Sequence, residues 1–207
     1  VVYSMSTLPG DIFLIIATFD ARVWRRLRRV SRVCHQVLTW AKYVDTFTVI
    51  VNYDGKQEWI LDGARHREND LPAALRVNSQ KWFHRGLHHR DGDKPASIVR
   101  KTKYWFTHGQ QHREHNRPAL IGPMSSLWLV YGRLHRTDGG PSSVGHKYIV
   151  WYRHDLFHRD DDRPAIIKTN GARKWYQYGR LHRDGGKPAI IEKDGVCSWW
   201  VHGNPVL

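Results

Sequence analysis

The sequence predicts an α+β chain, mostly β, in which short N-terminal helices precede an elongated antiparallel β-solenoid. Two observations predict this fold class. Tryptophan recurs at a nearly constant interval between residues 59 and 199, whereas the first forty residues carry apolar side chains at helical spacing. We therefore expect a helical segment over residues 1–46 and a repeat domain over residues 47–207.

The tryptophan interval defines about six to seven sequence repeats. Five tryptophans follow one another at 23 residues and two more at 24, namely Trp59, Trp82, Trp105, Trp128, Trp151, Trp175 and Trp199. Each begins the phrase Trp-x-x-x-Gly-x-x-His-Arg-x-x-x-x-Pro-Ala-x-Ile, which is complete from Trp175 to Ile191. A short fixed period indicates one supersecondary unit that buries its apolar face against its neighbours.

Two strands of about five residues are expected in each repeat. The aromatic run that starts at Trp175 and the apolar run from Pro188 to Ile191 have strand composition. Asn170-Gly171 lies four residues before Trp175, where a tight turn with two positive φ angles would join successive units. The other connection, around His182, is longer and polar. The expected architecture is a meander in which each unit adds two strands to a single sheet.

The tryptophan column is expected to form the core of the solenoid, beside a column of small residues. Proline should stand at strand starts, because it cannot donate a ladder hydrogen bond. Two units depart from the pattern, with Ser142 in the alanine position and Asp155 in the glycine position. The small residues are Ala73, Ala96, Ala119, Ala165 and Ala189, each preceded by a proline.

Charge and cysteine content limit the partners and the compartment. The formal net charge is +14, which favours acidic proteins, phosphate-rich polymers or anionic membranes. Cys34 and Cys197 are the two cysteines, and neither lies in a Cys-x-x-Cys pair, so we expect a reducing compartment without structural zinc or a disulfide. No apolar run approaches the ~20 residues of a membrane span. We expect an intracellular protein of the cytoplasm or nucleus.

A histidine-arginine pair recurs at one position of each repeat. Metal binding is the first chemical interpretation, but equivalent positions two strands apart are about 9.6 Å apart, too far for one ion. We expect instead that these side chains hydrogen-bond the connecting loop and pair with acids such as Asp91, Asp160 and Asp184. Nucleic-acid binding is a less favoured alternative. The pairs are His66 and Arg67, His89 and Arg90, His112 and Arg113, His135 and Arg136, His158 and Arg159, and His182 and Arg183.

Hydrolytic and phosphate-binding motifs are not found in the sequence. There is no Gly-x-Ser-x-Gly, no His-Glu-x-x-His and no phosphate loop. The acidic run from Asp160 to Asp162 is interpreted as a solvated loop. We therefore expect no enzymatic activity, no metal site and no cofactor.

The repeat phrase resembles the MORN repeat, a family of single-sheet β-solenoids with the same period. The resemblance covers residues 48–207 and rests on the aromatic strand, the glycine and the spacing, with His-Arg and Pro-Ala replacing several of that family's glycines and tyrosines. It implies a scaffold and an interaction surface rather than a catalyst.

The first forty residues resemble an F-box. Leu-Pro, an acidic residue, apolar helix positions and a later Leu-x-x-Val-Ser-Arg carry this similarity, over about residues 7–40. The resemblance implies binding to a Skp1-type adaptor. The residues expected to bind the adaptor are Leu8, Pro9, Ile12, Ile16, Phe19, Leu27 and Val30.

An F-box followed by divergent MORN repeats is similar to proteins encoded by giant DNA viruses of amoebae. The resemblance implies a substrate receptor that links a Skp1-type adaptor of a host ubiquitin ligase to a protein target, and the positive net charge favours an acidic one. The alternatives are a structural or virion-associated protein and a basic binder of nucleic acid or membrane surfaces. The last repeat ends after Trp199 and Trp200, for which we expect a homodimer contact.

Overall fold

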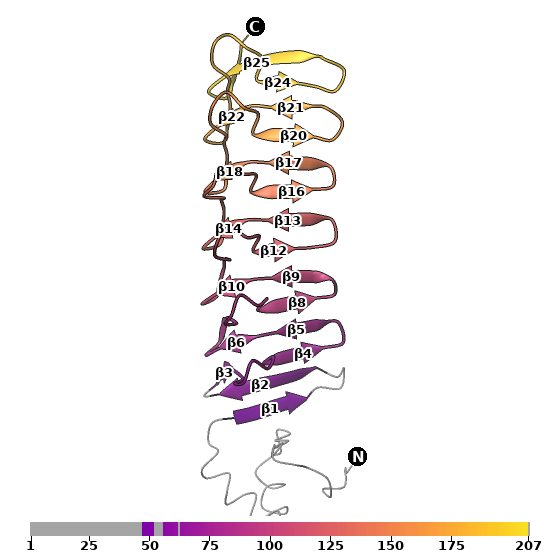
Figure 1. Ribbon diagram of the computed structural model, residues 1–207, viewed down its shortest axis with the longest axis vertical. Helices are drawn as coiled ribbons and strands as arrows, with labels where there is room; N and C mark the ends of the chain where they lie inside the picture. Colours follow the sequence, from indigo (N-terminus) through magenta and orange to yellow (C-terminus); the bar gives the residue numbers. More distant parts are fainter. Residues whose placement is uncertain (1–46, 52–55, 62, 207) are drawn as a thin grey trace, which may run out of the picture. The chain divides into compact units, whose positions relative to one another are not determined.

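A computed structural model of the protein describes residues 47–51, 56–61 and 63–206 (Figure 1). These residues form antiparallel β-structure, and no helix occurs among them, which confirms the predicted mostly β repeat region. The helices predicted over residues 1–46, and with them the seven adaptor-binding residues, lie outside the described part of the chain. The chain divides into two compact units between Leu87 and His88.

The first unit contains a meander in the order β1-β2-β4-β5, with β3 paired to the end of β2 at Ile60 and Leu61. Its core consists of Trp59, Ala73 and Phe83. The unit ends in β7 (Leu87–His88). Its other strands are β1 (Phe47–Val51), β2 (Gln57–Leu61), β3 (Ala64–Arg65), β4 (Ala74–Arg76), β5 (Ser79–Lys81) and β6 (Phe83–His84).

The second unit contains a longer meander in the order β8-β9-β12-β13-β16-β17-β20-β21-β24-β25-β26. Successive strands are neighbours, so each sequence repeat adds one rung beside the previous one (Figure 1). The strands are β8 (Ser97–Val99), β9 (Thr102–Tyr104), β12 (Leu120–Ile121), β13 (Ser125–Leu127), β16 (Ser143–Gly145), β17 (Tyr148–Val150), β20 (Ile166–Lys168), β21 (Arg173–Lys174), β24 (Ile190–Ile191), β25 (Cys197–Val201) and β26 (Asn204–Val206).

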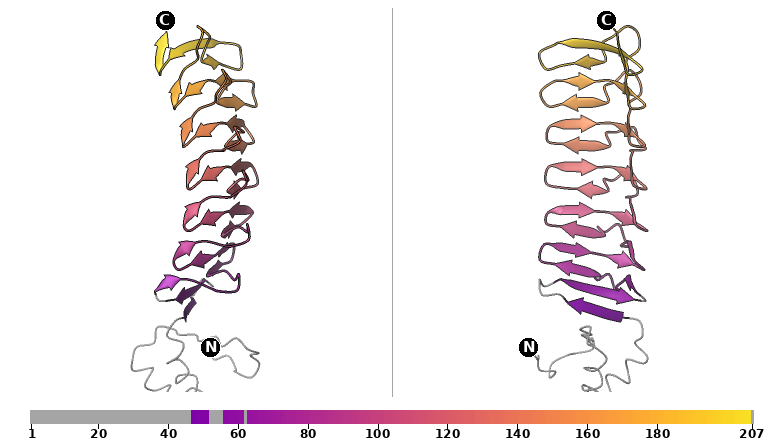
Figure 2. Two further views of the ribbon diagram at one scale, coloured as in Figure 1. Left: turned by 60° about the vertical axis from the view of Figure 1, so that its left-hand side comes forward. Right: turned by 180° about the vertical axis from the view of Figure 1, so that it is seen from behind.

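Small separate hairpins alternate with these rungs, and they correct the expectation that a repeat contributes only two strands to a single sheet. In the second unit they project out of the plane of the long sheet (Figure 2). They occupy the segment expected to be a longer polar connection. Their strands are β10 (Phe106–Thr107) with β11 (Gln110–Gln111), β14 (Leu129–Val130) with β15 (Arg133–Leu134), β18 (Tyr152–Arg153) with β19 (Leu156–Phe157), and β22 (Tyr176–Gln177) with β23 (Arg180–Leu181).

The repeat tryptophan lies at the corner between the two kinds of sheet. Trp105 separates β9 from β10, so the continuous aromatic strand predicted there is broken at its first residue. The Trp105 N–H donates to the Ala119 carbonyl at 2.8 Å, and the Trp105 carbonyl accepts from the His112 N–H at 3.2 Å. The two backbone hydrogen bonds of Trp105 therefore go to two different segments of the chain. This division fixes the bend at Trp105.

The hairpin turns explain two recurrent sequence signals. Tyr178 and Gly179 both have positive φ, 47° and 82°, and form the tight turn between β22 and β23. Asn170-Gly171 joins β20 to β21 as predicted, but only Gly171 has positive φ. The Asn170 side chain instead accepts a hydrogen bond from the Ala172 N–H at 3.1 Å, an Asx turn that replaces the expected pair of positive φ angles.

The core consists of the predicted small residues and five of the repeat tryptophans, Trp59, Trp82, Trp105, Trp151 and Trp175. Ala73, Ala96, Ala119, Ala165 and Ala189 have no exposed surface, and the prolines lie two residues ahead of a strand, as at Pro95 and β8. At the exceptional positions, the Ser142 hydroxyl bonds the Tyr152 backbone, and Asp155 has a φ of 69° and accepts from the Leu134 N–H. Both substitutions therefore retain the local geometry.

We expect Trp105→Ala to lower the free energy of unfolding by about 3–5 kcal/mol, because the ring is only 6% exposed in a close-packed corner. The matched change is Trp199→Ala. Because Trp199 is 43% exposed, this substitution should lower the free energy of unfolding by only about 1 kcal/mol. Urea unfolding followed by circular dichroism measures both. Equal losses for the two variants would contradict this account of the corner.

Candidate functional site

The residues between each repeat histidine and the following proline form a polar loop beside the tryptophan. We call this segment the His-Arg loop. The second unit contains the His-Arg loops 89–95, 112–118, 135–141, 158–164 and 182–188, and the first unit contains 66–72. Because the same loop recurs in every repeat, the geometry of its charged side chains decides what the array can bind.

The loop histidine holds a fixed tautomer. In His182, Nδ1 accepts from the His202 N–H at 3.3 Å, so in the neutral ring Nε2 carries the proton and donates to Asp184 at 3.0 Å. His89 with Asp91 and His158 with Asp160 show the same arrangement, as the sequence predicted. The described residues provide no hydrogen-bond partner for His135 Nδ1, and burial together with His154 lowers the pKa of His135.

The loop histidines of the second unit also stack on a ring of the next repeat, whereas His66 meets His84 edge-on. The rings of His182 and His202 lie 4.1 Å apart, and those of His112 and Tyr131 lie 4.3 Å apart. The partner ring belongs to the residue three positions after the next tryptophan, at the tight turn of the small hairpin. The histidine column therefore joins successive rungs.

The loop arginine forms three contacts at once. The guanidinium of Arg113 lies over the Trp105 ring at 3.9 Å, and its Nη1 donates to the Pro118 carbonyl at 3.4 Å. Its Nε and Nη2 hold both oxygens of Asp93, each at 2.8 Å. Asp93 belongs to the preceding His-Arg loop, so this bidentate pair links the two loops.

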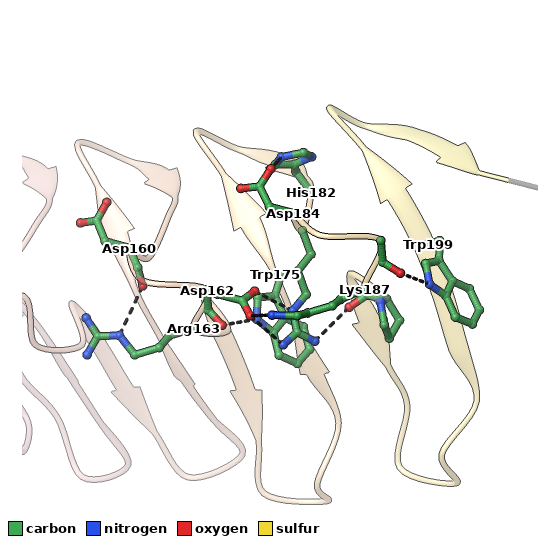
Figure 3. Close-up of polar contacts among 11 residues, drawn as sticks. Asp160, Asp162, Arg163, Trp175, His182, Asp184, Lys187 and Trp199 are labelled. Carbon is green, nitrogen blue, oxygen red and sulfur yellow. Dashed lines mark hydrogen bonds and ion pairs between the residues drawn. The ribbon is translucent and has the colours of Figure 1, made fainter.

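The same clamp occurs around Asp162, where a lysine adds a third contact (Figure 3). Arg183 Nε and Nη2 lie 2.7 and 3.1 Å from the two Asp162 oxygens, and Lys187 Nζ lies at 2.7 Å. These cations lower the pKa of Asp162 to about 2. Its carbonyl accepts from the Trp175 indole N–H at 3.0 Å, so Asp162 supports the corner as well as the clamp.

Shallow clefts lie between consecutive His-Arg loops in the second unit. One has a volume of about 140 Å³ between the loops that begin at His158 and His182, and one of about 230 Å³ lies next to Trp105. Both are lined by charged side chains. Within the part of the chain that the structure describes, no three His, Cys, Asp or Glu side chains are placed to hold a metal ion.

The sequence predicted the histidine-acid pairs but missed the clamp between loops. The spacing of the sequence contains this information. The acid that stands four residues after a loop histidine lies one repeat before the arginine that binds it. Of the residues predicted for a dimer, Trp199 is partly exposed and donates to the Gly186 carbonyl at 3.0 Å, and Trp200 lies in β25. Their contact with a second copy stays a prediction.

A scan against models of known protein families finds no match, and a search of curated proteins finds none either. Across residues 47–51, 56–61 and 63–206, no helix is long and apolar enough to cross a membrane.

We expect the Asp162 clamp to stabilise the fold only above acidic pH. Its folded pKa of about 2 is below the unfolded value of about 3.9, so the stabilisation is present above pH ~4 and is lost as the pH falls toward 2. Because the carboxylate is 37% exposed and thus screened, Asp162→Asn should cost about 1 kcal/mol at pH 7 and much less at pH 2, where about half of the Asp162 carboxyl groups are protonated.

The control is Asp161→Asn, a neighbouring acid in an exposed ion pair with Arg163. It should cost less than Asp162→Asn in the same urea titrations at pH 2, 4 and 7. A loss for Asp162→Asn that is unchanged between pH 2 and pH 7 would show that the clamp does not act through the carboxylate charge.

Proposed function

We propose that the protein is a non-catalytic interaction scaffold, a substrate receptor that links a Skp1-type adaptor to an acidic protein held by the repeat array. The observation that carries this proposal is the repetition of one charged cleft beside one buried tryptophan. An enzyme concentrates different groups at one place, whereas this surface presents the same groups once per rung. The histidines and arginines of these loops are engaged mainly in linking rungs.

The charge of the array supports an acidic partner. Residues 47–207 carry 26 Lys and Arg and 16 Asp and Glu, a difference of +10, and the remaining +4 belongs to residues 1–46. Several of the acids are already bound by cations, as Asp93 and Asp162 are, so the unmatched charge on the surface is positive. Complementary potential of this kind steers association with a negative partner.

The adaptor half of the proposal rests on residues 7–40, in which the residues that match the F-box pattern run from Leu8 to Arg32. Apolar anchors concentrate the energy of such an interface. The alternative, a structural or virion-associated protein, shares the repeat surface but needs no adaptor. Binding of the adaptor therefore separates the two functions.

Leu8→Ala combined with Pro9→Ala should weaken binding of a purified Skp1-type adaptor at least tenfold, since the two changes remove anchors of the interface. The full chain and the double variant are compared in a pull-down followed by calorimetry. The matched control is Leu71→Ala with Pro72→Ala, the same residue pair in a His-Arg loop, which should bind as the unmodified chain does. No binding by the unmodified chain would favour the structural alternative.

The nucleic-acid alternative makes a different prediction about salt. Six to ten phosphate contacts would lower affinity by about 10³–10⁵ between 50 and 200 mM salt. We expect much weaker and less salt-dependent retention on DNA, because Arg113 and Arg183 already hold carboxylates. Retention on a DNA column, measured between 50 and 200 mM salt, tests this expectation. A fall in affinity as steep as that calculated for six to ten phosphate contacts would overturn the acidic-protein proposal.

A further inference from the structure

Arg159 lacks the carboxylate that Arg113 and Arg183 hold, whereas Arg136, which follows Asn116 in the preceding loop, pairs with Asp138 of its own loop. The residue four positions after the loop histidine is aspartate in Asp93 and Asp162, and each accepts a bidentate arginine from the next loop. The same position in the His135 loop is Gly139. The arginine that would reach it is Arg159.

Arg159 nevertheless takes the position of the clamping arginines. Its guanidinium lies over the Trp151 ring at 3.5 Å, and its Nη1 donates to the Pro164 carbonyl at 3.2 Å. Its Nε is buried and has no hydrogen-bond partner among the described residues. Trp151 in turn donates its indole N–H to the Gly139 carbonyl at 3.2 Å. Gly139 and Arg159 therefore lie beside one tryptophan, as Asp93 and Arg113 do beside Trp105.

The space for the missing side chain is open. A Cβ placed on Gly139 would meet no atom within 4 Å, and its φ of 75° resembles the left-handed values of Asp93 and Asp162. A side chain at position 139 would therefore meet no steric obstacle at its Cβ.

A second cation lies in the same loop. Arg117 and Lys187, five residues after their histidines, reach Asp93 and Asp162 at 2.6 and 2.7 Å. The equivalent residue, Arg163, bonds Asp161 at 2.6 Å and the Asp160 carbonyl at 3.3 Å. Burial and the neighbouring Arg163 charge lower the pKa of Arg159, so an anion placed here would relieve both.

We propose that Gly139, Arg159 and Arg163 form a carboxylate-binding site, which takes an aspartate or glutamate side chain of the acidic protein partner. This inference rests on the proposed function and names the contact by which the array recognises its partner. A planar carboxylate matches the fork that Arg113 presents to Asp93. Asp160 and Asp161 stand between Arg159 and Arg163 in the sequence, and Asp161 pairs with Arg163, so their charges disfavour a phosphate dianion more than a single carboxylate.

The test is Gly139→Asp, which supplies the carboxylate from within the chain. The matched control is Gly186→Asp, the same substitution and charge change at the equivalent position of the His182 loop, where φ is 65° and a Cβ also meets no atom within 4 Å. The full chain and both variants are labelled with ¹⁵N. The Arg159 Nε–Hε signal is followed during titration with sodium acetate and with inorganic phosphate, at constant ionic strength.

Acetate should shift the Arg159 signal in the unmodified chain and in Gly186→Asp but not in Gly139→Asp. A hexaglutamate peptide should bind Gly139→Asp at least threefold more weakly than Gly186→Asp. No acetate shift in the unmodified chain, an equal shift in Gly139→Asp, or a response to phosphate alone would overturn the proposal. Both variants should still bind the Skp1-type adaptor. If the unmodified chain does not bind the adaptor, that result counts against the proposed function and not against this site.

Discussion

The hydrogen bonds of the repeat tryptophan determine the rest of the structure. Its N–H pairs with the strand that carries the buried alanine, its carbonyl pairs with the loop histidine, and its indole N–H reaches a carbonyl of the preceding loop. That indole bond recurs at 2.8–3.2 Å from Trp82 through Trp199, whatever residue supplies the carbonyl. A backbone acceptor is available from any residue, which is why aspartate, asparagine and glycine can all stand there.

Much of the fold could be predicted from the sequence because the dominant signals are local. The period, the Asn170-Gly171 turn, the prolines ahead of strands and the small residues beside the rings all follow from backbone sterics and side-chain size. The bend at Trp105 could not be predicted, since no residue type marks the place where a strand changes its partner. The small hairpins were hidden because several of their turns use tyrosine, as at Tyr131 and Tyr178, which sequence rules do not associate with positive φ.

The site was predicted in part for a similar reason. Histidine and its acid stand two residues apart, so sequence inspection finds the pair. Arg183 and Asp162 stand 21 residues apart, and only the stacking of rungs brings them together. The pairing of charged side chains must therefore be assessed between neighbouring repeats. A glycine at position 139, for example, removes a carboxylate from the array without changing the backbone.

The contacts of the His-Arg loop have a direction along the chain. Arg113 and Arg183 bind the loop before them, and the loop histidines of the second unit stack on the ring after them, so these repeats offer two unlike surfaces. Association of this kind is heterologous, and it can be lengthened without limit by adding identical copies. If two arrays were divided at the same position of the phrase and their parts exchanged, these contacts would be retained. If they were divided at different positions, a cation would be separated from its anion. One phrase is therefore the smallest segment that carries both kinds of contact, and an array built of whole phrases keeps them.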